Sequence, residues 1–256
     1  MPTKASLLVL SNILSFAAVL VVNYLANALP IAGRTPAEVS DMFPTLFTPA
    51  GFTFSIWGII YLLLLGFVVY QARFWGKEKP VFLRKIGWLF VLSCAANAAW
   101  LPVFHNLQIG WAMFIMLVLL GSLLVIYLRL DVGKAAAFPM ERWLVHLPFS
   151  IYLGWITVAS IANASILLTH LGWNGEPGGP QLWTVIVIAA AVGVGLTAVL
   201  FRRDFGFSLV IAWALFGIYS KRIANLGTED GMVEIAAIIG MGLLGLGIIY
   251  RIIKRN

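Results

Sequence analysis

Long apolar segments are the feature of this sequence that most limits the folds open to it. Eight stretches of about 20 mostly apolar residues follow one another along the 256-residue chain, and each is long enough to cross a bilayer as a helix. They lie at roughly 5–28, 52–72, 86–104, 108–129, 143–169, 182–201, 206–225 and 232–250. Within lipid a backbone must satisfy its own hydrogen bonds, so such segments fold as helices. The sequence therefore predicts an all-α, polytopic integral membrane bundle of about eight transmembrane helices.

Composition and charge placement exclude several classes of function. Hydrophobic residues make up 61% of the chain and charged residues 11%, which excludes an ordinary soluble domain. The 17 Lys and Arg residues lie in short clusters between apolar runs, so they report membrane topology rather than nucleic-acid binding. With the N-terminus inside, 14 of the 17 are cytoplasmic and only Arg34, Lys221 and Arg222 are external. This bias predicts that both termini face the cytoplasm.

Residues 47–70 join a Pro/Gly turn to an aromatic helix. Pro49 has a fixed backbone dihedral and Gly51 permits close backbone approach, so this pair sets the angle at which the second helix begins. Trp57 and Tyr61 follow, four residues apart on one helix face. Their indole N–H and phenol O–H need partners on other helices if they lie within lipid. An interfacial aromatic anchor is the alternative interpretation.

Two later helices each combine a tryptophan with an asparagine. Asn97 and Trp100 share a face of the third helix, and Trp155, Ala159 and Asn163 share a face of the fifth. The small residues around them let helices approach closely, and a buried amide must find hydrogen-bond partners. These asparagines therefore either hold two helices together or face a ligand.

Taken in order, these motifs resemble the TspO/MBR family of tryptophan-rich sensory proteins, which are related to the mitochondrial translocator protein. The three parts are P-x7-W-x3-Y-x4-G-x3-Y from Pro49, N-x2-W-x3-F from Asn97 followed by GWA at 110–112, and Y-L-x-W-x7-N from Tyr152. Family members are similar five-helix bundles that bind hydrophobic ligands, including porphyrins and sterols, beneath the loop joining helices one and two. In this chain that loop would be 29–51.

The resemblance implies a ligand pocket and its lining. The implied ligand-binding residues are Pro49, Trp57, Tyr61, Asn97, Trp100, Trp111, Trp155, Ala159, Ala162 and Asn163. Trp111 opens the fourth helix, where an aromatic-belt residue would also be found. Thr48 and Gly51 stand where the family often has a second proline and an additional tryptophan. We therefore do not extend the photochemistry of some family members to this chain.

The function that this pattern favours is a membrane receptor or binding protein with a sensory or regulatory role. Its ligand would be planar and hydrophobic, such as a porphyrin, another tetrapyrrole or a sterol-like lipid, with indole faces stacking on it. The alternative is a small-molecule membrane transporter. A transporter predicts inverted repeats and ionisable residues at mid-membrane, whereas the charges here cluster at helix ends.

The last part of the chain is expected to differ from a five-helix bundle. We expect residues 1–170 to form the TspO-like bundle and 171–256 to form a three-helix membrane extension. Glycines in the extension indicate tight helix contacts, either within the chain or in a homodimer. Lys221 and Arg222 are expected to snorkel to the surface or to pair with Glu229, Asp230 or Glu234. Contact with an anionic ligand, such as a tetrapyrrole carboxylate, is the alternative.

Motifs for catalysis and metal binding are not found in the sequence. His105, His146 and His170 are far apart in depth, and no metal-ligand, phosphate-loop or Ser/His/Asp pattern occurs. We therefore expect no enzymatic activity, no metal and no cofactor, apart from a bound tetrapyrrole or lipid. The expected partners are a hydrophobic small molecule and the lipid bilayer, not nucleic acid. The expected location is a bacterial plasma membrane.

Overall fold

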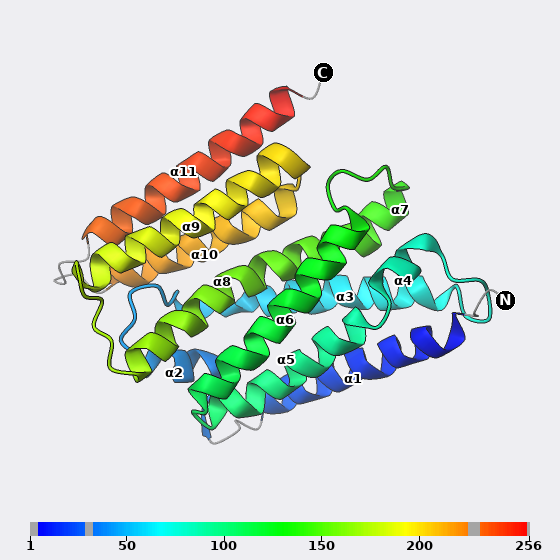
Figure 1. Cartoon of the computed structure of the whole chain (residues 1–256), viewed down its shortest axis with the longest axis horizontal. Helices are drawn as coiled ribbons and strands as arrows, with labels where there is room; N and C mark the ends of the chain where they lie inside the picture. Colours follow the sequence, from blue (N-terminus) through cyan, green and yellow to red (C-terminus); the bar gives the residue numbers. More distant parts are fainter. Residues whose placement is uncertain (1–4, 29–32, 225–230, 255–256) are drawn as a thin grey trace. The chain divides into compact units, whose positions relative to one another are not determined.

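The computed structural model describes residues 5–28, 33–224 and 231–254, and within these ranges every regular element is a helix (Figure 1). The helices are α1 (Ser6–Ala28), α2 (Pro36–Asp41), α3 (Ile56–Ala72), α4 (Val81–Ile86), α5 (Leu89–His105), α6 (Ile109–Leu130), α7 (Pro139–Glu141), α8 (Leu147–His170), α9 (Gly179–Arg202), α10 (Phe205–Ala224) and α11 (Gly231–Ile253). A 3-10 turn, η2 (Gly51–Ser55), leads into α3, and a π-helical turn, η3 (Arg142–His146), leads into α8.

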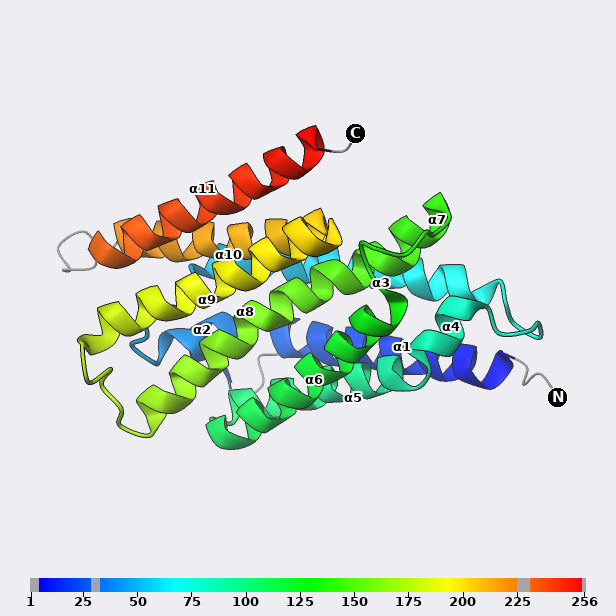
Figure 2. The ribbon, with the colours of Figure 1, turned by 45° about the horizontal axis from the view of Figure 1, so that its top comes forward.

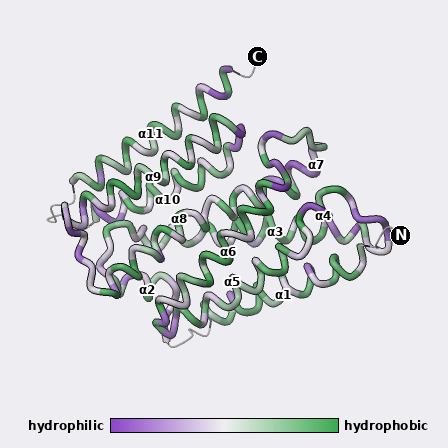
Figure 3. Tube along the Cα trace, viewed as in Figure 1, coloured by the Kyte–Doolittle hydropathy of each residue, from purple (hydrophilic) through white to green (hydrophobic). Residues whose placement is uncertain are grey.

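The chain is an integral, multi-pass membrane protein. Among the described residues, seven helical segments are long and apolar enough to cross a membrane. The remaining expected segment, 86–104, corresponds to α5, an apolar helix of 17 residues that is shorter than each of the seven spans. It begins at Leu89 rather than near residue 86, because Gly87 takes a positive φ of 54° and ends α4 there. Figure 3 shows hydrophobic residues along the long helices and hydrophilic residues at their ends and connections.

The packing divides the chain into two compact units. Unit 1 comprises Met1–Pro36 and Trp57–Leu153, and unit 2 comprises Ala37–Ile56 and Gly154–Asn256. This differs from the expected division after residue 170, because α8 contributes to both units and 37–56 belongs with the C-terminal helices. Unit 2 includes that segment because its backbone and side chains bond to α10, as described below.

In unit 1, α5 packs against α1 and α6. Its core is a group of buried phenylalanines in which the rings of Phe67, Phe90 and Phe149 meet edge to face, with centroids 5.1 to 5.9 Å apart. A buried hydrogen bond of 2.7 Å from Asn12 to Gln71 joins α1 to α3. Lipid tails are as apolar as these side chains, so close packing and such hydrogen bonds hold the helices together.

In unit 2, α9, α10 and α11 lie side by side, as both views show (Figures 1 and 2). Glycines make this contact close. A Cβ at Gly195 would lie 2.7 Å from Leu244, and one at Gly240 would lie 2.8 Å from Val192. Gly154 lets α8 approach α10, because a Cβ there would lie 3.1 Å from the backbone oxygen of Phe207. Of the glycines expected to make tight contacts, Gly195, Gly240 and Gly247 do so, whereas a Cβ at Gly193, Gly242 or Gly245 would have nothing within 4 Å.

Candidate ligand-binding site

Residues predicted from the second and third apolar segments meet in one cluster of unit 1. The rings of Trp57 and Tyr61 stack with centroids 5.5 Å apart, and Trp57 meets Tyr152 edge to face at 6.0 Å. The Asn97 amide donates to the Tyr152 hydroxyl at 3.0 Å, and its oxygen accepts from Asn23 at 3.0 Å. Asn97 therefore connects α1, α5 and α8. Sequence reasoning overlooked Asn23, because an isolated asparagine in an apolar run has no motif around it.

The hydroxyl of Tyr61 differs from the other polar groups of this unit 1 cluster in its hydrogen bonding. The Tyr61 hydroxyl is buried and makes no hydrogen bond of good geometry among the described residues, although the Asn97 and Asn23 side chains lie within reach of it. A buried hydroxyl of this kind normally finds a partner, so Tyr61 is the group in this cluster that a ligand could use.

The two other predicted tryptophans of unit 1 have different surroundings. Trp100 is buried and stacks on Phe104 with centroids 4.7 Å apart. Trp111 is 65% exposed, and its ring meets only the edge of Phe114 among the ring contacts described, at 6.0 Å. This exposure favours the aromatic-belt interpretation of Trp111.

The remaining predicted residues lie in unit 2. Trp155 is buried and meets Phe54 edge to face, with centroids 5.8 Å apart. Asn163 donates to the carbonyl of Ala159 at 2.9 Å within α8, and Ala159 and Ala162 are half-buried. Pro49 is buried near Gly217 of α10. A single pocket that combines these residues with the unit 1 cluster remains a prediction.

The segment before α3 is anchored to α10. The Ala50 amide donates to the Gly217 carbonyl at 3.0 Å, and the Trp213 indole donates to the Thr53 carbonyl at 3.0 Å. Lys221 forms an ion pair with Asp41 of α2 and not with Glu234, and the other two expected acids lie outside the described residues. These partners are 180 residues apart in the sequence, so local spacing could not have identified them. We call this segment, 37–56, the anchored loop.

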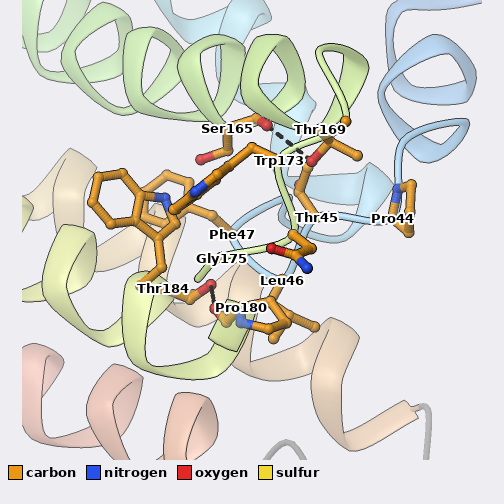
Figure 4. A pocket seen from close by; sticks show the side chains of 13 residues that line it. Pro44, Thr45, Leu46, Phe47, Ser165, Thr169, Trp173, Gly175, Pro180 and Thr184 are labelled. Carbon is orange, nitrogen blue, oxygen red and sulfur yellow. Dashed lines mark hydrogen bonds between the residues drawn. The ribbon is translucent and has the colours of Figure 1, made fainter. Parts of the chain in front are cut away.

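A cavity of about 340 Å³ lies within unit 2. Four elements form its wall: the anchored loop, the last turns of α8, the connection 171–178, and the start of α9. Figure 4 shows Ser165 and Thr169 on the α8 side and Pro180 and Thr184 on the α9 side. The lining residues are Pro44, Thr45, Leu46, Phe47, Ser165, Thr169, Gly172, Trp173, Asn174, Gly175, Pro180, Trp183 and Thr184.

Two indoles dominate the aromatic surface of this cavity. The rings of Trp173 and Trp183 meet nearly at right angles, with centroids 5.0 Å apart. The Trp173 N–H donates to the carbonyl of Glu176 at 3.2 Å, whereas the Trp183 N–H is buried without a partner in the described part of the chain. Sequence reasoning did not select either one. The available signal was a pair of tryptophans flanking the Gly/Pro-rich connection.

Three of the four cavity hydroxyls donate to their own helices, and the fourth, Thr45, shares a hydrogen bond with the Thr48 hydroxyl. Ser165 donates to Ile161, Thr169 to Ser165, and Thr184 to Pro180, each to a carbonyl one turn earlier. Among the described residues, no group of three His, Cys, Asp or Glu side chains is placed to hold a metal ion. The site can therefore offer aromatic faces, hydroxyl lone pairs and the exposed Asn174 side-chain amide to a small molecule.

Fold and site together define an all-helical, multi-pass membrane protein with an aromatic-lined cavity. A family model described as TSPO-like protein matches residues 8–250, so the chain belongs to this family. The match includes α9, α10 and α11. Neither a curated protein nor a solved structure shows significant similarity to the chain.

Proposed function

We propose that this protein is a membrane receptor or binding protein for a planar hydrophobic ligand, such as a porphyrin or a sterol-like lipid. The observation that carries the proposal is the cavity lined by Trp173 and Trp183. Its volume of about 340 Å³ lies within the range of about 300–1,000 Å³ usual for small-molecule sites. Indole rings offer wide, flat and rigid apolar surfaces for such a ligand.

The position of the cavity supports the same function. Residues 44–47 line it, and they belong to the connection between the first two long helices, the segment expected to cover a ligand. The unit 1 cluster around Trp57, Tyr61 and Asn97 is the second candidate location, because the Tyr61 hydroxyl is buried there without a hydrogen bond of good geometry.

The anchoring of the loop supports the proposed sensory role. A ligand in the cavity would contact 44–47, and the same loop is bonded to α10 through Ala50 and Thr53. A ligand that binds one arrangement of the loop better than another shifts the population toward it. Occupancy would thereby change the surface that the loop and α10 present to other molecules.

Titration of the purified full-length protein with protoporphyrin IX, followed by quenching of tryptophan fluorescence, tests the proposal. Trp173→Ala should weaken binding by about 1–3 kcal/mol, or about 5- to 150-fold, because an aromatic partner is lost. Trp143→Ala is the matched control, since Trp143 is 67% exposed and does not line the cavity. Unchanged affinity in Trp173→Ala together with a loss in Trp155→Ala would instead support the pocket that the family resemblance implies.

The proposed topology has a separate test. We propose that both termini face the cytoplasm of a bacterial plasma membrane, since 14 of the 17 cations then lie inside. A reporter fused after Asn256 should be active on the cytoplasmic side. Activity on the opposite side would reverse the orientation.

A further inference from the structure

The contact between α9 and α11 keeps one register along both helices. The glycine contacts between these helices are given above, and a Cβ at Gly247 would in addition lie 3.2 Å from Val199. Each of these contacts joins residues that are 48 or 49 positions apart in the sequence, so the two helices run in parallel. About one turn further on, the same separation joins Arg203 to Arg251. The contact face of α9 and α11 therefore ends at a pair of arginines.

Positive charge collects at this end of unit 2. The described residues at the end of α9, the start of α10 and the end of α11 include one acid, Asp204, and four cations, Arg202, Arg203, Arg251 and Lys254. Asp204 is buried, and its Oδ1 accepts a backbone N–H at the start of α10, at 3.2 Å. Arg203 and Lys254 are exposed, and Arg251 is half-buried. Because like charges repel each other, an anion bound between the cations would stabilise this end of the unit.

The side chains next to these cations are apolar and exposed. Phe201 of α9 is 70% exposed and Ile253 of α11 is 75% exposed. On membrane-spanning helices such side chains contact lipid tails, which are equally apolar. Figure 3 shows hydrophilic residues at the ends of α9 and α11, beyond the hydrophobic parts of these helices. The arginines therefore lie where acyl chains give way to headgroups, and a planar guanidinium binds a phosphate through two parallel hydrogen bonds.

We propose that Arg203 and Arg251 bind the phosphate of an anionic phospholipid, such as phosphatidylglycerol, whose acyl chains lie along the exposed apolar side chains of α9 and α11. Lys254 donates to the Tyr250 hydroxyl at 2.8 Å and has two further protons to offer the headgroup. Basic sites between membrane helices recognise anionic headgroups in this way. The cavity of unit 2 lies at the opposite end of α9, so the lipid site does not depend on the proposed function.

Native mass spectrometry of the full-length protein in detergent tests the site. The protein is given equal amounts of phosphatidylglycerol and phosphatidylcholine with the same acyl chains, and wild type should retain more phosphatidylglycerol. Arg203→Gln with Arg251→Gln should lower this preference about fivefold for each arginine removed. Arg129→Gln with Lys134→Gln is the matched control, because it removes the same charge at and just after the end of α6 and should keep the preference. Equal losses in the two double variants, or no preference in wild type, would overturn the site.

Thermal unfolding distinguishes a lipid from a free anion. Phosphatidylglycerol should raise the Tm of wild type but not that of Arg203→Gln with Arg251→Gln, whose fold is checked by circular dichroism. Inorganic phosphate at the same concentration should leave both Tm values unchanged, because it has no acyl chains to contact the apolar side chains. An equal rise with inorganic phosphate would overturn the assignment to a lipid. An undiminished rise in the double variant would overturn the assignment to these arginines.

Discussion

The unit 1 cluster and the unit 2 cavity use similar side chains to different ends. In unit 1, Asn97 is hydrogen-bonded on both sides and Trp57 packs against two tyrosines. In unit 2, the hydroxyls bond back to their own helices, the Trp183 N–H has no described partner, and about 340 Å³ stays open. A tryptophan beside a polar residue therefore does not by itself indicate a ligand site. The deciding feature is whether neighbouring side chains fill the space.

Filling the cavity should lower ligand affinity more than any other change. The unit 2 site would then be as fully packed as the unit 1 cluster. Ser165→Phe places a ring where the cavity now is, so protoporphyrin IX binding should fall roughly a hundredfold, or about 2.7 kcal/mol. Fluorescence titration measures the loss. Ser220→Phe is the control, because Ser220 makes the same bond to a carbonyl one turn earlier but does not line the cavity. Wild-type affinity in Ser165→Phe would show that the ligand binds elsewhere.

Displacing the anchored loop should have the next largest effect, a loss of stability together with a loss of ligand affinity. A Cβ at Gly217 would lie 2.0 Å from the Thr53 hydroxyl oxygen and 3.0 Å from Pro49, so Gly217→Ala should destabilise the protein by about 1–3 kcal/mol. Thermal unfolding in detergent measures the change, and ligand affinity should fall with it. Gly193→Ala, where a Cβ would have nothing within 4 Å, should be neutral or stabilising. Equal stability of the two variants would contradict the close contact.

Removing the central amide of the unit 1 cluster should affect stability more than binding. Asn97→Ala removes the bonds that Asn97 makes to the Tyr152 hydroxyl and to the Asn23 amide, which keeps its bond to Val19, at a cost of about 1–2 kcal/mol. Cys94, a buried free thiol on the same helix, allows unfolding to be followed by its reaction with a thiol dye. Asn106→Ala is an exposed control. A large loss of porphyrin affinity with little loss of stability would move the ligand site to unit 1.

Removing the ion pair of the anchored loop should have the smallest effect on stability. Lys221→Met removes the partner of Asp41, and an exposed pair of this kind contributes about 0.2–1 kcal/mol. Hydrogen exchange of the loop amides should rise at low salt and match wild type at high salt, where the pair is screened. The reciprocal exchange Asp41→Lys with Lys221→Asp should restore protection. No change in exchange at low salt would mean that backbone bonds alone anchor the loop.

The sequence by itself determined the helical, membrane-spanning class and most helix positions. Runs of about 20 apolar residues are sufficient for this, because backbone bonding in lipid is local to each helix. The run expected at 182–201 is α9 at Gly179–Arg202, and the one at 206–225 is α10 at Phe205–Ala224. Local spacing also placed Trp57 and Tyr61 on one face, where they stack.

Only the tertiary structure decided which polar and aromatic groups meet. The partners of Asn97 are Asn23 and Tyr152, and Asp41 meets Lys221 from 180 residues away. Trp173 and Trp183 are separated by a turn-rich connection that carries no helical period, so their contact could not be predicted from spacing. The cavity between the loop, α8 and α9 has the same origin, since open space is a property of packed elements and not of any one segment.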